Sequence, residues 1–194
     1  MNVDKAFFLP LLNGAKHFIV PLYQRPYSWT LEECKQLWDD INNYNNNKPY
    51  FIGSVVYVQK GYAPIGGSVQ KLYLIDGQQR ITTISLMILA LTKAMERDRF
   101  KIIIIDQGTE ETITPEKLIR LYLINDMEEG QLKYKIHLTK YDRETLTSLI
   151  EGNELQENYS RNIKNNYDYF EGLLKKADYF LKFWTNMKTT LTGI

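Results

Sequence analysis

The sequence predicts an α+β domain, in which a small mixed sheet carries packed helices and leads into a mainly helical C-terminal part. The apolar run Leu72–Ile75 has the length and residue types of a buried strand. From Ile81 to Met95, apolar residues recur every three or four positions, which marks one face of a helix. A second helical stretch, rich in aromatic residues, covers residues 157–187. Because 44% of the 194 residues are apolar, the chain can bury a substantial core.

A polar run, DGQQR at residues 76–80, separates this strand from its helix. Gly77 permits a backbone conformation closed to other residues, or lets a ligand approach closely. The first N–H groups of a helix lack partners inside it, and the helix dipole adds partial positive charge. Arg80 adds a full charge, and Thr82 and Thr83 add hydroxyls. These parts suit a phosphate. The alternative is an ordinary Asp-Gly turn that caps the helix beside a solvated arginine.

A dense aromatic loop lies upstream, from Tyr23 to Trp29. In a binding site, its rings would stack on a base or sugar, Arg25 would meet a phosphate and Gln24 would hydrogen-bond. The alternative for Tyr23, Gln24 and Arg25 is an internal structural role, and both interpretations stay open. Tyr27 and Trp29 are expected to pack in the core, because large aromatic residues carry much of a small domain's burial.

The remaining elements follow from local signals. Thr30 and Glu33 form a capping box that begins a helix, and Thr114 caps another. Gly53, inside a β-rich run, predicts a bulge or a close backbone approach. A hairpin between the strand at 50–59 and the strand at 71–76 would make the two strands antiparallel neighbours. The expected helices are 4–12, 31–44, 79–97, 115–124 and 142–150, and the expected strands are 16–21, 50–59, 71–76, 100–106 and 133–138.

Composition limits the functional classes. The formal net charge of +1 gives no sign of a strongly basic nucleic-acid face. Cys34 is the single cysteine, so no internal disulfide forms, and it is expected in the core. His17 and His137 lack metal-ligand spacing. Asp39 and Asp40 could hold a metal, but such a pair on an amphipathic helix is more often solvated, so we predict no metal site built by the protein alone. The start resembles no signal peptide, and no apolar run approaches the ~20 residues of a membrane span, which predicts a cytoplasmic chain without a membrane partner.

Three blocks of sequence carry a family resemblance: VPLYQRPYSW (Val20–Trp29), YFIGSVV (Tyr50–Val56) and DGQQRITT (Asp76–Thr83). In this order they resemble the N-terminal domain of the GmrSD family of type IV, modification-dependent restriction endonucleases. That domain is similar to the ParB/sulfiredoxin-like fold. The resemblance covers most of residues 1–190. It implies a ParB-like nucleotide-binding core at 1–110 and a helical extension at 111–194 that continues into a larger protein.

The resemblance also implies a site for a nucleoside triphosphate and Mg²⁺, whose hydrolysis regulates restriction. Asp76 would orient a water or Mg²⁺, Gln78 and Gln79 would contact phosphate or position water, and Arg80 would offset phosphate charge. The implied binding residues are Gly77, Thr82, Thr83, Gln24, Arg25, Tyr23, Gly53 and Ser54.

Two departures qualify the resemblance. Gln78 stands where sulfiredoxins place a catalytic cysteine, so sulfinic-acid reduction is not expected. Glutamines also replace the adjacent arginines of ParB-type turns, which leaves the identity of the nucleotide open. Cleavage in the family is assigned to a C-terminal HNH-type nuclease half, in cis or in trans, and no such motif occurs here.

Three hypotheses therefore remain. The first is a regulatory nucleotide-binding and nucleotide-hydrolysing domain, which meets DNA through the full-length protein. The second is a DNA-sensing module without hydrolysis, in which Tyr23, Arg25 and C-terminal lysines contact modified DNA. The third is a structural partner domain, in which the motif serves the fold alone.

Overall fold

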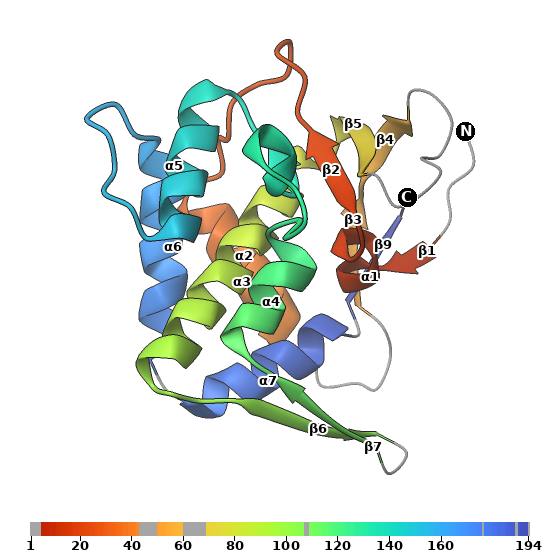
Figure 1. Ribbon diagram of the computed structural model, residues 1–194, viewed down its shortest axis with the longest axis vertical. Coiled ribbons are helices and arrows are strands. Elements are labelled where there is room, and N and C mark those ends of the chain that lie inside the picture. Colours follow the sequence, from red (N-terminus) through yellow and green to blue (C-terminus); the bar gives the residue numbers. More distant parts are fainter. Residues whose placement is uncertain are drawn as a thin grey trace.

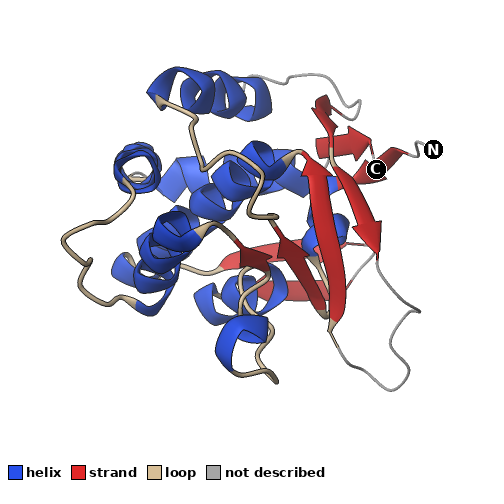
Figure 2. Cartoon of the chain, turned by 90° about the horizontal axis from the view of Figure 1, so that it is seen from above, coloured by secondary structure: helices blue, strands red, loops and turns tan. Residues whose placement is uncertain are grey.

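The computed structural model describes residues 5–42, 50–59, 69–106, 109–175, 177–188 and 190–193. Seen from above, helices gather on one side of the chain and strands on the other (Figure 2). The helices are α1 (Phe8–Leu12), α2 (Leu31–Asn42), α3 (Gln78–Arg97), α4 (Pro115–Tyr122), α5 (Lys140–Glu151), α6 (Arg161–Leu173) and α7 (Ala177–Lys188), with a 3₁₀ turn at Gly130–Lys133.

A mixed sheet supports the polar turn. Its strands lie in the order β4 (Val56–Gln59), β5 (Gln70–Asp76), β2 (Lys16–Ile19) and β8 (Ile136–His137). β2 runs parallel to both β5 and β8, while β4 pairs antiparallel with β5. The predicted α+β class, the small mixed sheet and the antiparallel pairing of the two hairpin strands are thus confirmed. Because three strands are parallel, their carboxyl ends meet at one edge of the sheet.

Two smaller sheets complete the strands. β1 (Lys5–Phe7) pairs antiparallel with β9 (Thr190–Gly193), which pairs in parallel with β3 (Tyr50–Ser54). This pairing brings the N- and C-terminal regions to the same side of the molecule (Figure 1). β6 (Ile102–Asp106) and β7 (Thr109–Ile113) form a separate antiparallel hairpin that extends near α7 (Figure 1).

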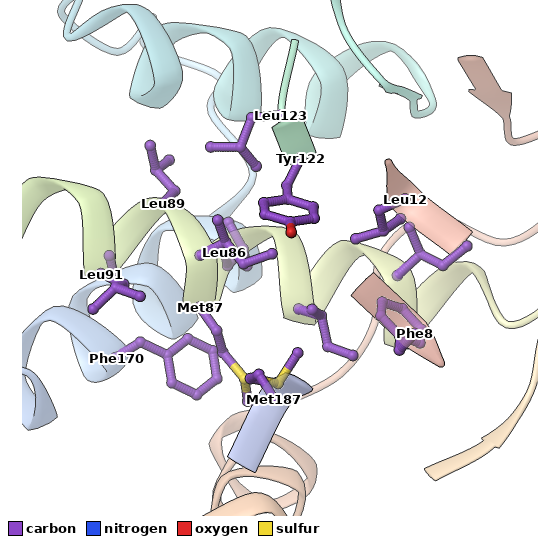
Figure 3. Packing of buried hydrophobic residues seen from close by; sticks show 14 of the residues in the cluster. Phe8, Leu12, Leu86, Met87, Leu89, Leu91, Tyr122, Leu123, Phe170 and Met187 are labelled. Atoms are coloured by element: carbon purple, nitrogen blue, oxygen red, sulfur yellow. The ribbon is translucent and has the colours of Figure 1, made fainter. Parts of the chain in front are cut away.

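α3 is the central helix of the core. It is buried around its whole circumference from Ile81 to Thr92, as expected for a helix enclosed by other elements. α6 and α4 pack against it. Figure 3 shows side chains of α3 packed with side chains from the surrounding elements. The labelled residues of α3 are Leu86, Met87, Leu89 and Leu91, and those of the other segments are Phe8, Leu12, Tyr122, Leu123, Phe170 and Met187.

The predicted strand at residues 50–59 is divided in the structure. It breaks at Val55 into β3 and β4, which belong to different sheets. Gly53 has φ +101° and lies where the register of β3 against β9 shifts, which confirms the predicted bulge. The turn of the expected hairpin, residues 60–68, falls outside the described residues.

Other differences arise at element boundaries. The expected long helix at 157–187 is two helices, α6 and α7. The segment at 4–12 begins as strand β1 before α1. Both predicted caps are confirmed, because Thr30 N and Oγ1 each donate to Glu33 Oε2 at 2.7 Å, and Thr114 Oγ1 accepts from Lys117 N at 3.2 Å.

Two further observations concern the single cysteine and the length of the helices. Cys34 is fully buried, and burial raises the pKa of its thiol to about 11, which fits the expected core role. In the part of the chain that the structure describes, no helix has both the length and the apolar composition for crossing a bilayer. The division into 1–110 and 111–194 stays a prediction.

Candidate functional site

The candidate site lies where the three parallel strands end. β2 leads into the aromatic loop, β5 into the DGQQR turn and β8 into the start of α5. A small cavity of about 10 Å³ lies between these segments; its lining includes Val20, Arg25, Gln78, Thr139 and Asp142. Ligands of α/β sheets bind outside the carboxyl ends of parallel strands. The topology therefore gathers the predicted site residues from distant parts of the sequence.

The turn between β5 and α3 depends on Gly77. Gly77 has φ +90°, and a Cβ there would lie 2.9 Å from the carbonyl oxygen of Ser54 and 3.0 Å from Val55 Cα. It is the N-cap of α3, and among the described residues no side chain caps this end. Asp76, whose side chain is exposed, therefore does not act as the cap. The first α3 hydrogen bond runs from Ile81 N to Gly77 O at 3.0 Å. The N–H groups ahead of it are the ones that helices leave without an internal partner.

Arg80 is a fixed, half-buried cation rather than a solvated one. Its Nη1 donates to the carbonyl oxygen of Ser54 at 3.0 Å. Its guanidinium lies over Gly53, where a Cβ would come within 2.7 Å of Nη2. Burial lowers the pKa of Arg80, and the nearby charge of Asp76 opposes that shift. The bulge in β3 thus makes room for this arginine beside the turn.

The side-chain amides of Gln24 and Gln78 are hydrogen-bonded in series, and a bond to the backbone of Ile75 sets their orientation. Gln24 Nε2 donates to the carbonyl oxygen of Ile75 at 3.0 Å, so Gln24 Oε1 faces the other way. Gln78 Nε2 donates to Gln24 Oε1 at 3.2 Å. Gln78 Oε1 is then left buried without a hydrogen-bond partner among the described residues. Such an atom is costly unless something donates to it, so it marks a position for a ligand N–H or a water.

Gln79 connects the DGQQR turn to the aromatic loop. Its Oε1 accepts from Ser28 N at 2.8 Å and from Trp29 N at 3.3 Å, and its Nε2 donates to Pro26 O at 3.1 Å. The side chain is 5% exposed. All of these bonds hold the backbone of the loop, so Gln79 positions the loop beside the turn.

The two threonines lie beneath the turn. Thr82 Oγ1 donates to Gln78 O at 2.7 Å, and Thr83 Oγ1 donates to Gln79 O at 2.9 Å. Both side chains are buried. The Tyr27 hydroxyl lies 2.7 Å from Thr83 Oγ1 and accepts from Asn166 Nδ2 at 2.9 Å. Burial raises the pKa of Tyr27, which is consistent with its confirmed place in the core.

The other predicted residues differ in exposure. Tyr23 is 78% exposed, Arg25 is exposed, and Trp29 is partly buried against the core. Gly53 and Ser54 lie under and beside the Arg80 guanidinium. The structure therefore brings the residues of all three sequence blocks together.

Two residues of the site were not predicted. Asp142 is buried, and its Oδ2 accepts from Tyr27 N at 2.7 Å and from Thr139 Oγ1 at 3.0 Å. Thr139 and Asp142 fit the S/T-x-x-D/E pattern of a helix start, so this local signal was available. Asn166, which also donates to Trp29 O at 2.8 Å, shows no signal beyond a polar residue on an apolar helix face.

Potential metal ligands are sparse in the described ranges, where no group of three or more His, Cys, Asp or Glu residues occurs. His17 Nδ1 lies 2.7 Å from Tyr134 O. Arg143 Nη1 lies 2.8 Å from His137 Nε2, and burial and this arginine hold the pKa of His137 at about 4. A divalent ion at the DGQQR turn would depend on Asp76 together with the oxygens of a ligand. Mg²⁺ is commonly bound in this way, through one or two carboxylates and substrate phosphates.

Comparison with known proteins identifies the chain's family. A comparison with curated proteins found no match. The family model described as the GmrSD restriction endonuclease, N-terminal domain, matches residues 8–192. This match includes all three sequence blocks and every site residue described above. The chain therefore belongs to the family of GmrSD restriction endonuclease N-terminal domains.

Proposed function

We propose that this chain is the regulatory, nucleotide-hydrolysing domain of a modification-dependent restriction protein that acts in phage defence. It binds a nucleoside triphosphate with Mg²⁺ at the DGQQR site, defined as Asp76–Arg80 with Gln24, Gly53 and Ser54. An HNH-type nuclease half, in cis or in trans, would cut the DNA. Family membership supports the restriction context. The observation that carries the nucleotide proposal is the fixed Arg80 beside the uncapped N-terminus of α3.

The phosphates would lie against the first turn of α3. That turn offers backbone N–H groups and the positive end of the dipole of a 20-residue helix. Arg80 supplies the charge, and its guanidinium is already oriented by Ser54 O. A partly buried cation interacts with an anion more strongly than a solvated one, because less water screens the pair. Gly77 lets this turn pack closely against Ser54 and Val55, where a Cβ would lie 2.9 Å from the carbonyl oxygen of Ser54, and so holds the first turn of α3 next to the Arg80 anchor.

The hydrolytic groups would come from Asp76 and Gln78. Asp76 is exposed next to the phosphate position and offers a carboxylate for Mg²⁺, whose charge would stabilise the transferred phosphoryl group. Gln78 Oε1 needs a donor, and the cavity that it borders, at about 10 Å³, is close to the space that one water molecule needs. We assign to Gln78 the orientation of a water molecule, and to Gln79 the positioning of the loop that carries Gln24 and Arg25.

The test is a calorimetric titration of the 194-residue chain with each of the four ribonucleoside triphosphates and Mg²⁺, followed by a phosphate-release assay. We expect saturable binding of at least one triphosphate, and slow release of phosphate. Asp76→Asn should keep the fold and lose the release of phosphate. Asp126→Asn is the matched control, because this aspartate pairs with Arg120 away from the turn. Absence of binding by any triphosphate, or equal release by Asp76→Asn and wild type, would refute the proposal.

A further inference from the structure

A second open site borders the aromatic loop. It is a groove of about 590 Å³ between the start of α5, the segment that joins α5 to α6, and the first residues of α6. We call it the α5–α6 groove. Pro26 and Tyr27 also line it, so the same loop borders both sites. Its volume falls within the range of pockets that hold small organic ligands.

The groove occupies a functional position in the sheet topology. β8 is parallel to β2 and ends at His137, and α5 begins at Lys140. The start of α5 therefore lies at the same carboxyl edge as the DGQQR turn and the aromatic loop. α5 and α6 lie next to each other at this end of the molecule (Figure 1).

Hydrogen bonds hold the walls of the groove in place. Asp142 is buried on α5 and accepts from Tyr27 N at 2.7 Å. Ser160 N donates to Thr145 Oγ1 at 2.8 Å, which ties the joining segment to α5. Asn162 Nδ2 donates to Tyr27 O at 3.4 Å. These bonds link three separate segments around the groove, so little ordering is required when a ligand binds.

The lining combines exposed aromatic rings with planar polar groups. Tyr141 is 57% exposed and Tyr159 is 40% exposed, although large aromatic side chains normally contribute to burial. Asn158 and Asn162 carry amides, Arg161 carries an exposed guanidinium, and Glu157 adds one exposed carboxylate. Aromatic faces with amides and arginine are the chemistry that proteins use for unstacked bases: rings stack on the base, amides read its edge and arginine meets a phosphate.

We propose that the α5–α6 groove binds an unstacked nucleobase of a DNA strand, with Tyr141 and Tyr159 stacking on the base and Arg161 contacting a neighbouring phosphate. The choice of DNA follows from membership in a restriction endonuclease family. Base binding in the groove does not depend on nucleotide hydrolysis, because Tyr141, Tyr159 and Arg161, which would contact the DNA, are not part of the DGQQR site.

The experiment measures fluorescence anisotropy of a labelled single-stranded DNA oligonucleotide titrated with the 194-residue chain, without added triphosphate. An abasic strand of equal length and a fully paired duplex are measured alongside. We expect the single strand to bind most tightly, because the abasic strand keeps the phosphates but offers no base, and the duplex keeps its bases stacked. Equal affinity for the abasic strand would overturn the proposal, as would absence of binding to the single strand.

Variants separate stacking from charge. Tyr141→Ala and Tyr159→Ala should each weaken binding by about 5- to 150-fold, whereas Tyr141→Phe keeps the ring and the affinity. Arg161→Gln should reduce the slope of the logarithm of the binding constant against the logarithm of the salt concentration by about one. Met127→Ala is the control, since Met127 is highly exposed and lies outside the groove. Thermal unfolding confirms that the variants fold; both tyrosines are exposed, so their removal should cost little stability. Unchanged DNA affinity in both alanine variants would overturn the proposal.

A triphosphate titration of the same variants tests whether the groove binds a base of DNA or the base of the bound triphosphate. Tyr141→Ala and Tyr159→Ala should keep wild-type affinity for the triphosphate. A parallel loss of triphosphate affinity would assign the groove to the base of the bound nucleotide and overturn the assignment to DNA.

Discussion

Gln79 offers the sharpest test of how the DGQQR turn and the aromatic loop are joined. Gln79→Ala removes three hydrogen bonds, to Ser28 N, Trp29 N and Pro26 O. At about 1 kcal/mol for each bond, and because water partly replaces them at the exposed Ser28, we expect a loss of about 2 to 3 kcal/mol of unfolding free energy. For a chain of this size, that loss lowers the melting temperature by about 4 to 12 °C.

The assay for Gln79→Ala is urea unfolding followed by circular dichroism and by tryptophan fluorescence, because Trp29 lies in the affected loop. Gln36→Ala is the matched control, since Gln36 is an exposed helical glutamine and its loss should change stability by less than about 0.5 kcal/mol. If Gln79→Ala were as stable as Gln36→Ala, the three bonds would not hold the loop and the reasoning would be refuted.

Further predictions follow from the same geometry. Gly77→Ala should lower the free energy of unfolding by about 2 kcal/mol or more, because φ +90° and the contact with Ser54 O both oppose a side chain. The control is Gly14→Ala, since Gly14 has φ +86° but no atom within 4 Å of the added Cβ. The difference between the two variants in urea unfolding separates the contact from the backbone strain. Gly53→Ala should displace the Arg80 guanidinium and weaken triphosphate binding by about tenfold in calorimetry, and unchanged affinity would contradict this. His137 has a folded pKa of about 4, below its unfolded value, so the stability that it contributes is complete above about pH 6.5 and is lost as the pH falls towards 4. We expect a loss of about 1 to 2 kcal/mol over this window after allowing for partial exposure, and His137→Gln should flatten the profile.

Local sequence signals predicted much of this architecture. The strand before Gly77 and the helix after it follow from residue periodicity, and the caps at Thr30 and Thr114 follow from short patterns whose chemistry lies within one turn. The bulge at Gly53 was predictable for the same reason, because a glycine inside a strand commonly marks a bulge or a close approach of another group to the backbone.

Long-range contacts determine the features that local patterns did not reveal. The run at 50–59 is continuous in β propensity, so nothing local shows that its halves join different sheets. Gln78 and Gln79 are adjacent and identical, yet successive residues of a helix point about 100° apart, so one faces Gln24 and the other faces the loop backbone. Asp142 joins the site because β8 pairs with β2, a contact between segments that are far apart in the sequence.

The measurement that tests the central claim most directly is the dissociation constant of the preferred triphosphate for wild type, Arg80→Ala and Arg97→Ala. Arg97 is the matched arginine on α3, about 25 Å along the helix, where it pairs with Asp98. Because hydrogen bonds to charged groups are strong, Arg80→Ala should weaken binding by about 10- to 100-fold while its circular dichroism shows a folded chain. Arg97→Ala should bind like wild type. Equal affinities for Arg80→Ala and wild type would contradict a phosphate site at the DGQQR turn.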